Sequence, residues 1–207
     1  QGELHHECGI AAVFHADGPE VSKLAPIAGQ RDSVTRLVPR MLLDMQNRGQ
    51  LAAGMTAYDP NRGALLETHK QVGTVAEAFR LNHLAKFESI MAGLKGPAGI
   101  GHVRYATCGR DDRSYAQPFE RAHGRKSKWY GVAFNGQLAN FQELKNELLG
   151  KGDYHLKRDI DTEILMHSIS YELARQDVPT NWVEVFSHLA SRFDGSYNIV
   201  LLSAQGD

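Results

Sequence analysis

The order of strand-like and helix-like segments constrains the fold of this chain more than any other feature of its sequence. Apolar and alternating runs predict strands at residues 8–15, 54–58, 64–72, 100–105, 129–134 and 195–203. Helical spacing predicts one helix from near Pro39 to before Gly49, and three more at residues 141–150, 160–173 and 182–193. Because strands and helices come in separate runs instead of βαβ alternation, we expect an α+β fold with a largely antiparallel sheet.

Turn and cap residues support these bounds. Residues 17–33 carry glycines and prolines and are expected to form a loop, and residues 59–63 form a turn between two strands. Asn140 with Glu143 has the form of a capping box, and Asn181 with Glu184 marks another helix start.

Composition excludes several classes of partner. The 207 residues are 42% hydrophobic and carry a formal net charge of −1, which gives no reason to expect nucleic acid or a membrane as partner. Two cysteines, Cys8 and Cys108, are too few for a disulfide framework, so we expect a reducing, cytoplasmic compartment. The ten histidines are scattered without metal-ligand spacing, so no metal site is predicted.

Cys8 lies between a seven-residue polar leader and a strand-like run. A lone cysteine that starts a strand is most often a buried core residue. If the bond before it were cut, however, Cys8 would carry both a thiol nucleophile and an α-amine base. The leader has no apolar segment and is therefore not a secretory signal, so we interpret residues 1–7 as a propeptide.

Four polar segments lie at or beside the ends of predicted strands. Each has an ordinary structural explanation: a helix stop at Arg48-Gly49, a surface ion pair at Arg104, a hairpin turn at Asn135-Gly136 and a helix-start carboxylate at Asp161. The segments are RGQLAAG at residues 48–54, GHVRYAT at residues 101–107, NGQLAN at residues 135–140 and DIDTE at residues 159–163.

Taken together and in this order, the segments resemble the glutaminase domain of class II glutamine amidotransferases, and most of all its amidophosphoribosyltransferase branch. That family begins its mature chain with Cys-Gly-Ile, as at Cys8, and also carries the AQPF found at residues 116–119. The resemblance covers residues 8–202. It implies an N-terminal-nucleophile hydrolase fold, a four-layer αββα sandwich with largely antiparallel sheets.

The resemblance also implies a role for each matched residue. Cys8 attacks the side-chain amide of glutamine, and a γ-glutamyl thioester forms and is hydrolysed to glutamate. Asn135 and Gly136 form the oxyanion hole. The substrate-binding residues are Arg104 for the α-carboxylate, Asp161 for the α-ammonium, Thr107 as a further carboxylate donor, and His102 as a support for Arg104 rather than a base.

The sequence departs from the pattern of this branch at two positions, neither of which is a catalytic group. They weaken the assignment to the branch more than they weaken the inferred chemistry. Asn47 stands where the branch usually has His, and Leu51 stands where it usually has Asp. A relative of glucosamine-6-phosphate synthase therefore remains an alternative. So does an unprocessed, non-catalytic subunit that binds glutamine or serves as a scaffold, because an intact leader leaves Cys8 without an α-amine.

Residues 8–207 are expected to form one glutaminase domain that lacks the family's last strands. No phosphoribosyltransferase segment is recognisable, so no cofactor is expected here; Mg²⁺ would belong to that absent domain. Expected partners are glutamine, a synthase domain or subunit that accepts ammonia, and another copy of the chain in a homo-oligomer. The chain could be a fragment, half of a split enzyme, or a stand-alone domain.

Overall fold

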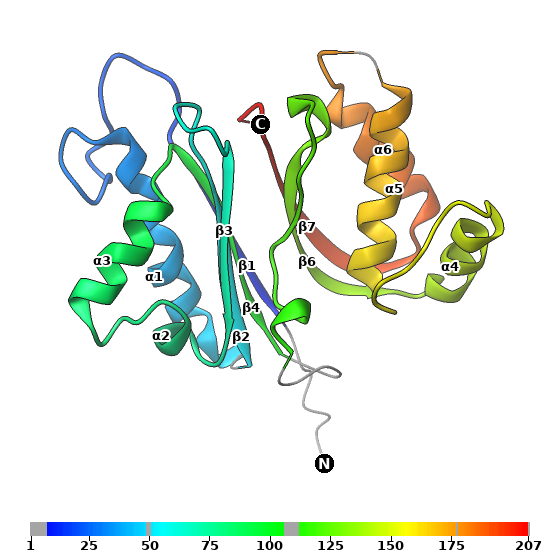
Figure 1. The fold of residues 1–207 in the computed structure, drawn as a ribbon, viewed down its shortest axis with the longest axis horizontal. Coiled ribbons are helices and arrows are strands. Elements are labelled where there is room, and N and C mark those ends of the chain that lie inside the picture. The colour runs from blue at the N-terminus through cyan, green and yellow to red at the C-terminus, as the bar shows by residue number, and fades with distance from the viewer. Residues whose placement is uncertain (1–7, 49–50, 106–111, 177, 207) are drawn as a thin grey trace.

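The computed structural model describes residues 8–48, 51–105, 112–176 and 178–206. In Figure 1 two sheets face each other in the middle of the molecule, and helices cover the outer face of each. This confirms the predicted four-layer αββα sandwich.

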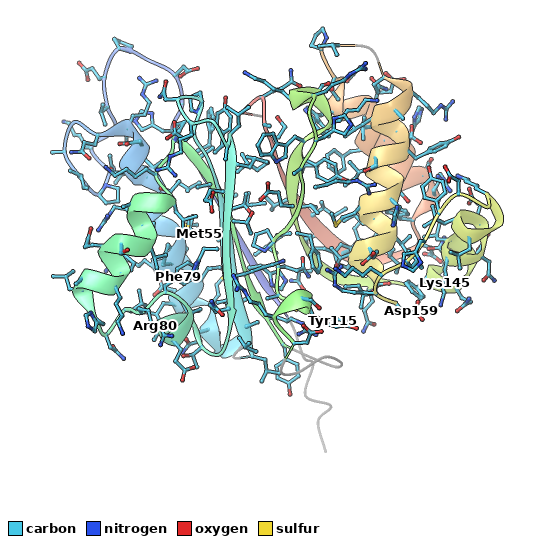
Figure 2. The ribbon with its side chains drawn as sticks, in the orientation of Figure 1. Met55, Phe79, Arg80, Tyr115, Lys145 and Asp159 are labelled. Atoms are coloured by element: carbon cyan, nitrogen blue, oxygen red, sulfur yellow. The ribbon has the colours of Figure 1, made fainter. Side chains whose placement is uncertain are left out.

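The first sheet has four strands in the order β1-β4-β2-β3, and every neighbouring pair is antiparallel. Its strands are β1 (Gly9–Phe14), β2 (Ala52–Tyr58), β3 (Leu66–Val72) and β4 (Ala98–Arg104). The helices α1 (Leu37–Asp44), α2 (Val75–Ala78) and α3 (Leu84–Gly93) cover its outer face. Figure 2 shows Met55 and Phe79 in the layer between that sheet and these helices, where both side chains are fully buried.

The second sheet has three strands in the order β5-β6-β7, also antiparallel. Its strands are β5 (Phe119–Arg121), β6 (Tyr130–Leu138) and β7 (Gly195–Ser203), covered by α4 (Phe141–Gly150), α5 (Asp161–Arg175) and α6 (Trp182–Arg192). Short 3₁₀ helices lie at Arg31–Arg36, Gln46–Arg48, Arg113–Tyr115 and Lys126–Lys128.

Three apolar clusters fill the three spaces between the four layers. The middle cluster joins the two sheets and includes Ile100 of β4, Ala133 of β6 and Leu202 of β7. Each outer cluster packs a sheet on its own helices. The sheets therefore dock through a packed apolar contact that also encloses polar side chains such as His102, and this packing fixes the distance across which a site can be built.

Most predicted elements are confirmed, but two local expectations are wrong. Asn135 and Gly136 are not a hairpin turn, because both lie inside β6 and pair with β7. The Asn140 side chain does not cap α4. Its Nδ2 donates to Arg192 O at 2.8 Å, and its Oδ1 accepts the N–H of Asp194 at 3.1 Å. No prediction covered α2, α3 or β5.

Candidate functional site

A small cavity lies where the two sheets meet, and four of the predicted site residues line it. Cys8 precedes β1, Arg104 ends β4, Gly136 lies in β6 and Asp161 begins α5. Its volume of about 110 Å³ is well below the ~300–1,000 Å³ of a drug-sized pocket, which suits a small metabolite. The described residues that line it are Cys8, Arg104, Tyr105, Tyr115, Gln117, Phe134, Gly136, Ile160, Asp161 and Thr162.

Cys8 is half-buried at the edge of this cavity. Its Sγ lies 3.7 Å from Tyr105 O. Burial raises the pKa of the thiol, while a backbone hydrogen bond of Tyr105 and the Arg104 guanidinium act in the opposite direction. A Cβ on the following residue, Gly9, would lie 2.8 Å from Val103 Cγ2, so the backbone behind the thiol fits closely against β4. A thiol held in this way depends on a nearby base to reach the nucleophilic thiolate form.

Arg104 brings a cation to the same cavity. Its side chain is buried, and its guanidinium carbon lies 5.3 Å from the centre of the Tyr115 ring. Figure 2 shows Tyr115 on the short 3₁₀ helix beside the lower ends of the two sheets. An aromatic face attracts and orients a guanidinium, whose planar fork has the geometry that binds a carboxylate.

Asp161 faces the cavity from the first turn of α5. Burial raises the pKa of its carboxyl group, and a backbone hydrogen bond from Leu138 partly offsets this. The loop before it is tied down by Glu163, which accepts the Lys157 N–H at 2.9 Å and a 2.7 Å bond from Arg158. The predicted helix-start position of Asp161 is therefore confirmed, and the same position makes it a cavity-lining anion.

Gly136 has a backbone that other residues rarely adopt. Its φ is +141°, and a Cβ there would lie 2.2 Å from Ser196 O. Asn135, the preceding residue, is half-buried and pairs with Asn198 of β7. Asn135 is not among the described residues that line the cavity, whereas its neighbours Phe134 and Gly136 are.

His102 is fully buried between the sheets. Burial lowers its pKa to about 3, so the ring is neutral at pH 7. Its Nε2 lies 3.1 Å from Phe134 O, which requires the proton on Nε2 because a carbonyl oxygen only accepts. His102 thus contacts β6 in addition to lying two residues before Arg104 on β4.

Some predicted residues lie outside the described part of the chain. These are Thr107, Cys108, Gly49 and the leader at residues 1–7.

Sequence reasoning missed several residues of the cavity wall: Tyr105, Tyr115, Gln117, Phe134, Ile160 and Thr162. Most of them neighbour a recognised motif residue, and Gln117 belongs to AQPF, a motif that was noticed but given no role. Tyr115 carries no sequence signal of its own.

Metal-binding clusters and membrane-spanning helices are both absent from the part of the chain that the structure describes. Among the described residues, no group of three or more His, Cys, Asp and Glu side chains is placed to hold a metal ion. Within the same ranges, none of the helices has both the length and the apolar character needed to cross a membrane.

Residues 90–201 match the family described as glutamine amidotransferase domain. Curated relatives include the amidophosphoribosyltransferase of Archaeoglobus fulgidus, 33% identical over 94% of this chain and 36% of the relative. The amidophosphoribosyltransferase of Methanothermobacter thermautotrophicus is 29% identical over 99% of this chain and 37% of the relative. The chain thus spans little more than a third of the length of these relatives.

Two solved structures share the fold. One, described as the allosteric regulatory enzyme of purine biosynthesis, matches 96% of this chain and 35% of its own with a TM-score of 0.69 and 24% identity. The other is the B. subtilis glutamine phosphoribosylpyrophosphate amidotransferase complexed with ADP and GMP. It has a TM-score of 0.66 and 24% identity, again over 96% of this chain and 35% of its own.

Proposed function

The chain belongs to the glutamine amidotransferase domain family, and on that premise we propose that it hydrolyses glutamine to glutamate and ammonia through Cys8. The observation that carries the proposal is the meeting of Cys8, Arg104, Gly136 and Asp161 around one small cavity. A thiol, a cation, an anion and a glycine backbone are the groups that this reaction requires.

Glutamine suits the charges of the cavity. Its α-carboxylate pairs with the Arg104 guanidinium, whose planar fork forms two parallel hydrogen bonds to a carboxylate. Its α-ammonium pairs with Asp161. The positive charge of that ammonium lowers the pKa of the Asp161 carboxyl group and so offsets the increase that burial causes. With both ends held, the side-chain amide extends toward Cys8.

The chemistry proceeds in two steps. The α-amine of a processed Cys8 takes the thiol proton, and Sγ attacks the amide carbon. An ordinary α-amine has a pKa near ~8 and an ordinary thiol one near ~8.5, and burial raises the pKa of the Cys8 thiol further, which adds to the cost of this proton transfer. The C–N bond then breaks, the amine returns the proton, and ammonia leaves a γ-glutamyl thioester. Water hydrolyses the thioester to glutamate and restores the thiol.

The Gly136 N–H and the Asn135 side-chain amide are the proposed donors to the oxyanion. A donor of this kind typically contributes ~2.7–4 kcal/mol of transition-state stabilisation. The inclusion of Asn135 rests on its adjacency to Gly136, and its side chain must turn toward the cavity when glutamine binds.

The acceptor of the ammonia is proposed from the relatives. Because the curated relatives are amidophosphoribosyltransferases, the proposed acceptor is a phosphoribosyl pyrophosphate site on a separate domain or subunit. The proposed setting is purine synthesis, because one similar structure is described as an enzyme of purine biosynthesis, and the cytoplasm is proposed from the low cysteine content alone. Residues 1–7 are the proposed propeptide, since only its removal gives Cys8 its α-amine.

The test combines intact mass with turnover. The purified protein is expected to have lost residues 1–7 and to release glutamate from glutamine, and Cys8→Ala is expected to abolish release. Bound glutamine without turnover on a protein that keeps its leader would instead favour a non-catalytic subunit. Glutamate release from a protein with an intact leader would overturn the α-amine mechanism.

A further inference from the structure

One row of residues crosses the four-stranded sheet just behind the cavity. In register, Ile10 of β1 faces His102 of β4, His102 faces Gly54 of β2, and Gly54 faces Lys70 of β3. We call these four residues the transverse row. Gly54 and His102 belong to two of the motif segments recognised in the sequence, whereas Lys70 belongs to none.

Gly54 leaves a gap in the transverse row, and the backbone of Gln117 fills it. A Cβ on Gly54 would lie 2.4 Å from Gln117 O and 2.6 Å from Lys70 Cβ. No other residue type fits there without displacing one of them. The segment that carries Gln117 therefore rests directly on the four-stranded sheet.

Lys70 fastens that segment on both sides of Gln117. Its Nζ donates to Ala116 O at 2.7 Å and to Pro118 O at 3.1 Å. The same ammonium lies 4.5 Å from the centre of the Phe119 ring. One cation thus holds the two carbonyls that flank Gln117 and contacts the first residue of β5.

From this position against Gly54, the Gln117 side chain extends to β6. Its Oε1 accepts the N–H of Phe134 at 2.8 Å, and its Nε2 donates to Phe134 O at 3.2 Å. In the β5–β6 register Phe119 faces Val132, so the position opposite Phe134 is that of Gln117. β5 begins only at Phe119, so it offers Phe134 no backbone hydrogen bonds. The Gln117 side-chain amide makes the two hydrogen bonds that a paired strand would have made there.

Phe134 O also accepts from His102, so two side chains from outside β6 hold one carbonyl. That carbonyl shares a rigid peptide plane with the N–H of Asn135. The next peptide along carries the N–H of Gly136. A change in how Phe134 is held is consequently transmitted to the proposed oxyanion donors.

We propose that Gln117 and Lys70 are positioning residues that set the oxyanion-binding segment at Asn135 and Gly136, with Lys70 acting through Gln117. The proposal rests on the function proposed above. In this proposal Gln117 and Lys70 act through the backbone of Phe134 rather than on the reacting atoms, and the AQPF segment gains a role in the reaction.

The charges around Lys70 are compatible with this task. Burial, with Arg158 and Arg113 nearby, lowers the pKa of Lys70 to about 8, and Glu120 raises it. At pH 7 the side chain is still mainly an ammonium with protons for both carbonyls. Arg113, which precedes the segment that carries Gln117, donates from Nε to Lys70 O at 2.8 Å. This hydrogen bond holds the start of that segment against β3.

The experiment compares Gln117→Met and Lys70→Met with the parent enzyme, as full-length processed protein. Both replacements keep the length of the aliphatic side chain and remove its polar end. Steady-state glutamine hydrolysis gives kcat and KM, and mass spectrometry of the Cys8 peptide gives the rate of alkylation by iodoacetamide, a reaction that needs no oxyanion hole.

A misplaced oxyanion donor lowers kcat and leaves KM nearly unchanged, because the interaction exists only in the transition state. We expect kcat to fall about 100-fold for Gln117→Met, the effect of roughly 1 Å of misplacement, and about tenfold for Lys70→Met. Alkylation of Cys8 should keep the parent rate. Lys70→Arg, which retains a charged donor for two carbonyls, should recover part of the loss.

Two control variants make the result specific. Lys151→Met removes another lysine that lies over an aromatic ring, 4.1 Å from the centre of Tyr171, far from the cavity lining. Gln142→Met removes an exposed glutamine of α4. Both should keep the parent kcat.

The outcomes separate this proposal from the proposed function. If the parent enzyme hydrolyses glutamine and Gln117→Met retains its kcat, or loses activity through KM or through slower Cys8 alkylation alone, the positioning role is overturned. If the parent enzyme fails to hydrolyse glutamine while Cys8 is processed, the proposed function itself fails.

Discussion

The two sheets hold their parts of the site in different ways. In the four-stranded sheet, β4 lies between β1 and β2; it pairs with β1 from Ala98 to Val103 and with β2 from Ala98 to Arg104. In the three-stranded sheet, β6 pairs with β7 from Tyr130 to Leu138, but with β5 only from Tyr130 to Val132. Backbone pairing therefore holds β4 on both sides up to Val103, the residue before Arg104, whereas among the described residues the stretch from Phe134 to Gly136 pairs with a strand on one side only.

This difference indicates how the reaction is divided. The proposed nucleophile and the proposed carboxylate-binding cation lie at the ends of β1 and β4, next to a stretch of β4 that is paired on both sides. The three-stranded half carries the proposed oxyanion segment, and side chains from the opposite sheet complete its support. A site assembled across two sheets thus depends on their docking as much as on any single residue.

The largest effect should come from the four-stranded side. Cys8→Ala removes the nucleophile and is expected to lower glutamine hydrolysis by on the order of 10⁴-fold or more, because no other group can form the thioester. Glutamate release measures it. Cys108→Ala is the matched control and should retain activity; equal loss in both variants would contradict the assignment of Cys8.

Next in size is a change on the three-stranded side. Gly136→Ala places a Cβ 2.2 Å from Ser196 O at a φ of +141°, so the strand must shift away from β7. We expect kcat to fall by about 10²–10³-fold, the cost of losing one oxyanion donor. Gly18→Ala, where a Cβ meets nothing within 4 Å, is the control. An unchanged kcat would show that β6 is not the oxyanion strand.

A smaller effect should appear in substrate binding. Arg104→Lys keeps the charge but loses the planar fork and the stacking on Tyr115. KM for glutamine should rise by roughly 10–100-fold with a smaller change in kcat, corresponding to about 1.5–3 kcal/mol of charge-assisted hydrogen bonding. A selective loss of kcat would instead place Arg104 in the chemical step.

The smallest expected effect is a decrease in the free energy of unfolding at acid pH. Because burial lowers the pKa of His102 to about 3, the unfolded state binds a proton there between about pH 6.5 and pH 3 and the folded state does not. The free energy of unfolding should therefore decrease as pH falls through that window, by at most ~1.4 kcal/mol per pH unit from this group.

Denaturant unfolding between pH 7 and pH 5, above the titration of most carboxylates, measures that slope. His102→Gln keeps an amide donor for Phe134 O and removes the titration, so its slope should be shallower. Identical slopes would show that His102 titrates alike in the folded and unfolded protein, which would contradict its lowered pKa.

Much of this architecture was predictable, for identifiable reasons. β1 and the second half of β7, at residues 199–202, are apolar runs, and the amphipathic pattern of α5 is long enough to stand out. β5 has only three residues, and α3 buries only Met91, so neither has a strong pattern. A capping box at Thr74 and Glu77 was a readable signal for α2 that no prediction used.

The site was partly predictable in the same sense. Motif matches identified Cys8, Arg104, Gly136 and Asp161, all of which line the cavity. The role of Gln117 follows only from a register between two strands that the sequence does not encode locally. Asn135-Gly136 has the composition of a turn, and only its pairing with β7 shows that it continues a strand.

The pairing of β1 with β4 has a consequence for synthesis on the ribosome. Gly9 faces Val103, so the strand that follows Cys8 cannot reach its place until residues nearly a hundred positions later have been made. Such non-local pairing is slow and comes late in folding. The thiol is therefore present in the nascent chain long before Arg104 and Gly136 surround it, and it gains its proposed reactivity toward glutamine only once both sheets have been synthesised and have docked.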